Sequence, residues 1–250
     1  MSGHSKWAGI KHKKAIVDAK KGKIFSKLIR EITVAARSGG GDLTANARLR
    51  QAMDRAKEAN MPSDNIKRAI QKGTGELPGV SYEEIIYEGY GPGGVAVLLN
   101  ILTDNKNRTT SEVRHLFERN GGHLGGAGSV AWVFEKRGLI TVDGDKCKED
   151  ELMEVVLEAG AEDLKKEGNT FEIITSLSDF EKVKKTIKEK GIEYNLAEVT
   201  MIPKEVRKLD VQLGKQLLRL IDTLEEHDDV QHVYANFDIP DEVIEEMEKE

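Results

Sequence analysis

Positively charged side chains crowd the first thirty residues of the chain, where nine Lys and Arg stand against one acidic residue, Asp18. Cations at this density attract phosphate groups, and phosphate contacts supply most of the sequence-independent affinity of proteins for nucleic acids. Trp7 lies among the cations, and an aromatic ring beside positive charge can stack on an unpaired base. The pattern predicts a nucleic-acid contact surface formed by Lys6, Trp7, Lys11, His12, Lys13, Lys14, Lys20, Lys21, Lys23, Lys27 and Arg30.

Two alternatives without a binding function stay open for this basic segment. The charges could form a solvated face that only keeps the chain in solution. Trp7 could equally pack on the neighbouring helices as a hydrophobic anchor, because Trp is highly buried on average.

A second candidate anion site is the polar segment TDNKNRT at residues 103–109. It follows a predicted strand and precedes a predicted helix, whose start at Thr109 matches a capping box with Glu112. Lys106 and Arg108, together with the free amides of the helix N-terminus, could hold a phosphate. The alternative is an ordinary polar loop with a well-capped helix.

No group of residues in the sequence predicts catalysis or metal binding. The Gly-rich segment GGHLGGAGS at 121–129 lacks the spacing and the Lys-Ser/Thr ending of a P-loop, and turns with positive φ account for most of its glycines. His115 and His123 have no carboxylate or thiol at metal-ligand spacing. The segment His227-Asp228-Asp229 has no nucleophile beside it and is interpreted as a solvated helix cap. We expect no catalytic residue, no metal and no cofactor, and therefore not an enzyme.

The two signs of charge are separated along the chain. Residues 1–77 hold 17 Lys and Arg and 7 Asp and Glu, a balance of +10, whereas the rest hold 38 − 17 = 21 and 44 − 7 = 37, a balance of −16. A polyanion is attracted by the first part and repelled by the second, so the field would orient the protein on its partner.

The composition is that of a folded protein from a reducing compartment. Hydrophobic residues make up 38% and charged residues 33% of the 250 residues, which is unlike a disordered chain. Cys147 is the single cysteine, so no disulfide can form within the chain. No apolar run is long enough to span a bilayer, and the N-terminus lacks the apolar stretch of a signal peptide. We expect a cytoplasmic protein that does not contact a membrane.

Residues 1–77 are predicted to form a basic helical bundle with an N-terminal arm. Apolar residues from Ile24 to Ala36 recur with the spacing of one helical stripe. Two further helices are expected from about Thr44 and from about Ser63, the last one ending at Gly73. The segment GTGELPGV at 73–80 then indicates a boundary.

After this boundary the pattern changes to that of strands. The segments YEEIIYEGY and GVAVLLNILTD flank the turn GPGG, which predicts two tightly joined strands, and SVAWVFE at 129–135 predicts another. Residues 138–200 follow the βαββαβ order of a ferredoxin-like unit. The last helix and strand have no partner inside that unit, so they should complete the sheet begun before it.

We therefore expect a multidomain α and α+β fold, in which a helical bundle is followed by two α+β (ferredoxin-like) domains, the third inserted in the second. The expected domains are residues 1–77, residues 78–135 together with 204–250, and the inserted residues 136–203.

Several long segments resemble those of a known family. They are GHSKWAGIKHKKA, DAKKGKIFSKLIREITVAARSGGGD, EGYGPGGVAVLL, LTDNKNRTTSEVRH, GSVAW, LEAGAEDL and AEVTMIP. Together they resemble the YebC/PmpR family of bacterial proteins, which are similar to the mitochondrial translational activator of cytochrome c oxidase. The resemblance covers nearly the whole chain and implies three domains, one helical and two α+β.

The resemblance implies a nucleic-acid-binding regulator of gene expression. Members are usually described as transcriptional regulators that bind DNA. Others look like ribosome-associated factors, which contact ribosomal RNA and help translation through proline-rich stretches. The expected partner is therefore DNA or ribosomal RNA, with the ribosome as a further partner in the second case, and the oligomeric state is left open.

Overall fold

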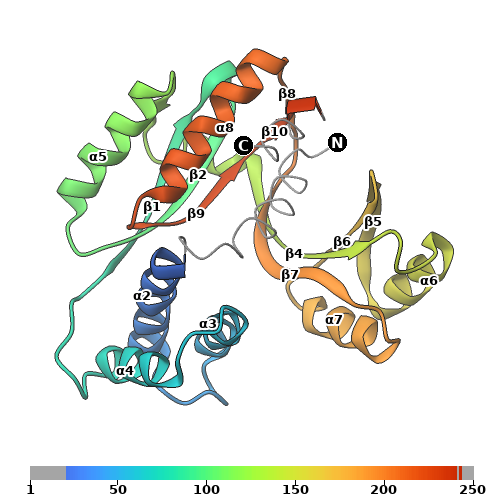
Figure 1. Cartoon of the computed structure of the whole chain (residues 1–250), viewed down its shortest axis with the longest axis horizontal. Coiled ribbons are helices and arrows are strands. Elements are labelled where there is room, and N and C mark those ends of the chain that lie inside the picture. Colours follow the sequence, from blue (N-terminus) through green and yellow to red (C-terminus); the bar gives the residue numbers. More distant parts are fainter. Residues whose placement is uncertain (1–20, 241, 244–250) are drawn as a thin grey trace. The chain divides into compact units, whose positions relative to one another are not determined.

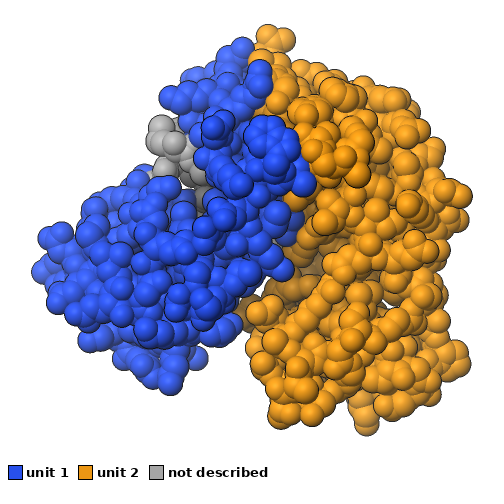
Figure 2. Space-filling model, turned by 180° about the vertical axis from the view of Figure 1, so that it is seen from behind, with its two compact units in different colours: residues 1–12, 130–211, 234–250 blue, residues 13–129, 212–233 orange. Residues whose placement is uncertain are grey.

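The computed structural model describes residues 21–240, 242 and 243 (Figure 1). They form two compact units (Figure 2). The first along the described chain comprises residues 21–129 and 212–233, orange and labelled unit 2 in Figure 2, and the second comprises 130–211 and the described residues from 234 onward, blue and labelled unit 1. Both units contain helices and antiparallel sheet, so the predicted mixture of α and α+β structure is confirmed. None of the described helices is long and apolar enough to cross a membrane.

The first unit begins with a helical bundle, as predicted. It is built from α2 (Lys21–Gly39), α3 (Ala47–Glu58) and α4 (Ser63–Thr74). The apolar stripe of α2 is buried against α3 and α4, and the core residues include Leu28, Ile32, Ala35, Leu49, Ala52, Ile66 and Ala69. The helix expected from about Thr44 begins at Ala47, because the side chain of Asn46 caps it by accepting a hydrogen bond from the amide of Leu49 at 3.0 Å.

Helix α4 ends one residue later than expected. The helix continues through Gly73 to Thr74, and the left-handed residue that ends it is Gly75, with φ of 85°. Gly73 is buried inside the bundle. A Cβ atom there would lie 2.4 Å from the carbonyl oxygen of Thr33 and 2.7 Å from the Cβ of Ala36, so this glycine permits the close approach of α4 to α2.

The same unit holds a sheet in the order β3-β1-β2-β9. Its strands are β1 (Glu83–Tyr90), β2 (Ala96–Thr103), β3 (His123–Leu124) and β9 (Val230–Ala235), and its helices are α5 (Lys106–Arg119) and α8 (Val211–Glu226). The turn at residues 91–94 joins β1 to β2 in register, as predicted. The C-terminal strand β9 completes a sheet that begins more than a hundred residues earlier.

The second unit contains the βαββαβ order predicted for residues 138–200. Its elements are β4 (Phe134–Asp143), α6 (Glu149–Ala159), β5 (Ala161–Glu167), β6 (Thr170–Thr175), α7 (Phe180–Glu189) and β7 (Tyr194–Pro203). The strand order β5-β6-β4-β7 is fully antiparallel and ferredoxin-like. Both helices pack on one face through Leu152, Val156, Phe180, Val183 and Ile187. The same unit also contains a separate two-stranded parallel sheet, formed by β8 (Arg207–Lys208) and β10 (Phe237–Asp238).

Two details of the predicted fold are wrong. Residues 129–135 do not form a strand of their own, because Ala131–Val133 make a single 3₁₀ turn and Phe134 starts the long strand β4. The ferredoxin-like order is also not found in the first sheet, because the hairpin joins β1 directly to β2 where that order requires a helix. The division into three domains, with 136–203 inserted, stays a prediction.

Candidate nucleic-acid interface

Most of the predicted contact residues belong to the N-terminal arm. Lys6, Trp7, Lys11, His12, Lys13, Lys14 and Lys20 lie outside the described residues. Lys21 is the first residue of α2. The predicted contacts whose side chains can be placed are Lys23, Lys27, Arg30, Lys106 and Arg108.

Three cations of α2 bind the end of α8 and the turn that follows it. The Lys27 Nζ donates to the carbonyl of Glu225 at 2.6 Å, Lys23 donates to that of Glu226 at 3.4 Å, and Arg30 donates to that of Asp228 at 2.7 Å. The last carbonyls of a helix lack intrahelical partners and carry the negative end of its dipole, so cations are favourable there. This stripe of α2 therefore holds the helical bundle on the α+β part of its own unit.

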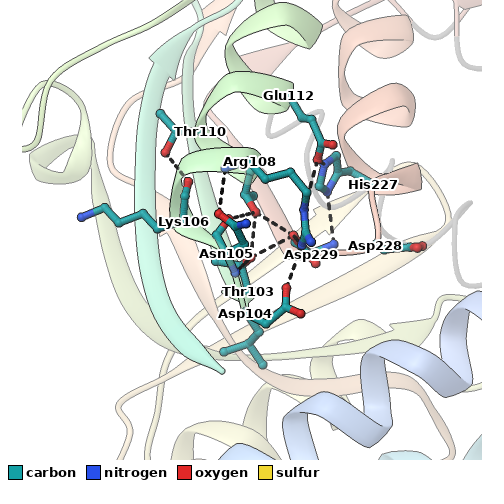
Figure 3. Close-up of polar contacts among 12 residues, drawn as sticks. Thr103, Asp104, Asn105, Lys106, Arg108, Thr110, Glu112, His227, Asp228 and Asp229 are labelled. Atoms are coloured by element: carbon teal, nitrogen blue, oxygen red, sulfur yellow. Dashed lines mark hydrogen bonds and ion pairs between the residues drawn. The ribbon is translucent and has the colours of Figure 1, made fainter. Parts of the chain in front are cut away.

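The centre of this junction is the carboxylate of Asp229, which is only 2% exposed. One oxygen accepts from Arg30 at 2.5 Å. The other accepts from Arg108 at 2.8 Å, Thr109 at 2.6 Å and Thr103 at 3.0 Å (Figure 3). Two cations and two hydroxyls thus surround one buried charge, which is the condition under which a buried carboxylate is stabilising.

This environment keeps Asp229 ionised. Burial alone raises the pKa of the carboxyl group, but the hydrogen bonds from Thr109, Arg108 and Thr103 and the positive charge of Arg30 outweigh burial and lower the pKa from 3.8 to about 2. The same bonds to Asp229 and Asp104 raise the pKa of the Arg108 guanidinium. The ion pair is therefore intact at neutral pH.

The lowered pKa gives a prediction for acid stability. A carboxyl group whose pKa is lower in the folded state stabilises the fold fully above its unfolded pKa, and this contribution is lost as the pH falls towards the folded pKa. We expect the difference in free energy of unfolding between the wild type and Asp229→Asn to be constant above about pH 5 and to shrink as the pH falls from about 4 to about 2. Urea unfolding at a series of pH values measures it, and a difference independent of pH would contradict the assignment.

The loop at 103–109 is organised by Asn105. Its side chain accepts from the amide of Arg108 at 3.1 Å, and this cap starts α5 at Lys106. The predicted start at Thr109, with a capping box to Glu112, is therefore wrong. Thr109 lies inside the helix and is fully buried, so its hydroxyl faces Asp229 instead of capping α5.

The two cations of this loop point apart. Arg108 turns towards Asp229 and Asp104, at 2.8 Å from each, while the exposed Lys106 extends away from the cluster (Figure 3). The Arg108 side chain is 42% exposed but is paired with two carboxylates of its own fold, whereas Lys106 extends into solvent away from them. A phosphate held jointly by these two side chains stays a prediction that this arrangement does not favour.

The interpretation of His227-Asp228-Asp229 as a solvated cap is wrong for two of its residues. Asp229 is buried, and His227 accepts from the Asp229 amide through Nδ1 at 3.1 Å while its Nε2 lies 2.9 Å from Glu112 (Figure 3). Only Asp228 has an exposed side chain. One feature of the sequence could have indicated that Asp229 is buried: it directly precedes the apolar strand β9. Among the described residues, no three His, Cys, Asp or Glu side chains are grouped as metal ligands.

Three cations of α3 also form ion pairs within the fold. Arg48 binds both carboxylate oxygens of Glu84 at 2.9 and 3.0 Å. Arg55 pairs with Glu31, and Lys57 lies 3.5 Å from Asp54. The cations of α4, by contrast, make no ion pair with any described residue, and they are not among the contacts predicted from the sequence: Lys67, Arg68 and Lys72.

Comparison with known proteins places the chain in a family. Residues 5–76 match the model of the TACO1/YebC protein N-terminal domain, and residues 82–237 match that of the TACO1/YebC second and third domain. The chain belongs to the TACO1/YebC family. The resemblance noted in the sequence is thereby confirmed.

Relatives in the TACO1/YebC family match along their full length. A "Probable transcriptional regulatory protein" of Syntrophobacter fumaroxidans is 59% identical over 99% of this chain and 100% of its own. One of the same description from Natranaerobius thermophilus is 57% identical over 98% and 99%. The crystal structure of a conserved hypothetical protein from Aquifex aeolicus superposes with a TM-score of 0.82 at 49% identity, covering 92% of this chain and 96% of that one.

Proposed function

We propose that this TACO1/YebC protein regulates transcription by binding DNA through the positively charged residues of its N-terminal part. The observation that carries the proposal is the separation of charge, +10 in residues 1–77 against −16 in the rest. The names of the full-length relatives, probable transcriptional regulatory proteins, support a regulatory role. Phosphate contacts of this basic part supply affinity, and the acidic remainder is repelled by the DNA and stays turned away from it.

The proposal sets aside the predicted contacts of α2 that hydrogen-bond within the described part of the fold. Lys23, Lys27 and Arg30 hold α2 on the end of α8 and the turn after it, so replacing them would disturb the fold and binding together. The contacts proposed for DNA are therefore those of the arm and the first residue of α2, namely Lys6, Lys11, Lys13, Lys14, Lys20 and Lys21, with Trp7 and His12 among them.

Removal of residues 1–20 tests this proposal, because the cut ends where α2 begins. The deletion removes five lysines, so the slope of log affinity against log salt should fall by up to about 4 to 5, and affinity for a DNA duplex at about 0.1 M salt should drop at least about tenfold. Fluorescence anisotropy with a labelled duplex measures both quantities.

Two controls make this result decisive. A variant with Arg in place of Lys11, Lys13, Lys14 and Lys20 keeps the charge and should keep the affinity, and the truncated chain should retain the unfolding midpoint of the full chain. Equal DNA affinity and equal salt slope with and without residues 1–20 would refute the role given to the arm.

The ribosomal alternative is separated by crosslinking and sequencing in living cells, comparing the wild type with Lys→Glu changes at Lys11, Lys13, Lys14 and Lys20. Reads on discrete promoters that disappear in the variant are the expected result. Reads concentrated on ribosomal RNA would replace the transcriptional role by that of a translation factor, whose arm contacts RNA phosphates and unpaired bases.

A further inference from the structure

Helix α4 presents positive charge on the face turned away from the bundle core. Lys67, Arg68 and Lys72 are exposed, whereas Ile66 and Ala69 on the other face are 6% and 1% exposed. Arg68 and Lys72 are one helical turn apart, roughly 6 Å along the axis, so their charges line up on one side. The helix therefore has a row of cations on its exposed face and apolar residues on its buried face.

The three cations differ from those of α3 in their ion pairs. Lys67, Arg68 and Lys72 make no ion pair with another part of the described chain, while Arg48 and Arg55 of the preceding helix are paired with Glu84 and Glu31. The one acidic residue on α4 is Asp64, in its first turn. Long cationic side chains left unpaired in this way are available to an external polyanion.

The connection into α4 is short and fixed. Helix α3 ends at Glu58 and α4 begins at Ser63, so residues 59–62 make the turn. Asn60 adopts the left-handed conformation with φ of 58°, and Met61 is 5% exposed, with its amide bonded to the carbonyl of Ala56 at 2.9 Å. A turn of this length also joins the two helices of a helix-turn-helix motif, whose second helix enters the major groove.

We infer that α4 is the helix that enters the major groove of duplex DNA, with Lys67, Arg68 and Lys72 contacting its phosphates and groove edges. The inference rests on the proposed DNA-binding function and adds the element that docks. The major groove of B-DNA is wide enough for an α-helix, and the deep, narrow major groove of duplex RNA is not. The partner of this face is therefore duplex DNA.

The test uses the full chain with Lys67→Gln, Arg68→Gln and Lys72→Gln combined. A mixed-sequence DNA duplex of about 25 base pairs and an RNA duplex of the same sequence are titrated at several salt concentrations. The triple variant should lose about 2 to 3 from the salt slope for DNA and at least about tenfold in affinity at about 0.1 M salt, because each phosphate contact contributes about 0.9 to the slope. The substitutions are on an exposed helix face, so the unfolding midpoint should stay that of the wild type.

The control removes three charges from another exposed helix face, with Lys182→Gln, Lys185→Gln and Lys188→Gln on α7. DNA affinity of this variant should stay within about threefold of the wild type, because long-range charge alone is screened over about 10 Å at this salt. An equal loss of DNA affinity in the α4 and α7 variants would overturn the inference, because the loss would then follow from net charge alone.

The remaining outcomes distinguish failure of the role given to α4 from failure of the proposed DNA-binding function. Wild-type binding to DNA that is unchanged in the α4 variant overturns the role of α4 and leaves the proposed function standing. A wild type that binds neither duplex removes the proposed function itself. Loss of RNA binding alone in the α4 variant overturns the assignment of the groove to DNA.

Discussion

Replacing Asp229 by Asn should destabilise the first unit by about 3–5 kcal/mol, the range observed when one partner of a buried ion pair is removed. The carboxylate is the shared acceptor of Arg30, Arg108, Thr103 and Thr109. An amide of the same shape offers one acceptor oxygen and carries no charge, so it leaves Arg30, a side chain 19% exposed, without its counter-ion. The expected loss is large because α2, β2, α5 and the segment before β9 all meet at this group.

The neighbouring residue supplies the matched control for this prediction. Asp228 is exposed and contributes its backbone carbonyl, not its carboxylate, to Arg30, so Asp228→Asn should change the free energy of unfolding by less than about 0.5 kcal/mol. Urea unfolding gives the two values, and hydrogen exchange at the amides of β2 and α5 locates the loss. Similar effects from the two substitutions would show that charge at this end of the chain matters and that the buried geometry does not.

The sequence predicted best the parts whose contacts are local. The apolar stripe of α2 and the βαββαβ order of the second unit follow from periodicity within a few residues, and both are found. The hairpin between β1 and β2 was equally readable, because the glycines at the turn supply the needed backbone conformation, with φ of 69° at Gly93 and 71° at Gly94.

The site could not be predicted because it depends on contacts distant in sequence. Arg30 and Asp229 are 199 positions apart, and nothing near either residue indicates its partner. The contact with Asp229 also changes the interpretation of Arg108, which is exposed but is already paired with a carboxylate of its own fold. A basic stripe therefore indicates an external polyanion only after the internal acceptors of its own fold have been found.

Positive φ, the reason predicted from the sequence, explains only some of the glycines in the segment 121–129. Positive φ explains Gly121 and Gly128, at 76° and 82°. Gly122 is required for another reason, since an added Cβ would lie 2.5 Å from the Tyr90 carbonyl oxygen. At Gly125 an added Cβ would lie 2.6 Å from the Ser129 hydroxyl, a side-chain group that would have to move. The expectation that positive φ explains most of these glycines is therefore wrong. The segment folds back on β1, where the amide of Gly128 donates to the Glu88 carboxylate at 2.6 Å.

Substituting Gly73 by Ala should destabilise the bundle by about 1–3 kcal/mol, the usual cost of adding atoms to a packed interior. The new methyl group would lie 2.4 Å from a backbone oxygen of α2, and backbone cannot rotate away as a side chain can. Ala has a helix propensity about 1 kcal/mol better than Gly, so the clash must exceed this gain for the net effect to be unfavourable. Because α4 carries Lys67, Arg68 and Lys72, DNA affinity should fall along with stability if the bundle positions this helix.

Gly22 in α2 is the control for the same chemical change. Outside its chain neighbours and the backbone of its own helix, no atom of the described residues lies within 4 Å of a Cβ at Gly22, and its φ is not in the left-handed region, so Gly22→Ala should be neutral or slightly stabilising. Thermal and urea unfolding of the two variants measure the difference, and the expected order is Gly22→Ala at or above the wild type and Gly73→Ala below it. A Gly73→Ala variant as stable as Gly22→Ala would mean that α4 moves away from α2 at no cost. The fixed presentation of the α4 cations would then have no support from the packing of the bundle.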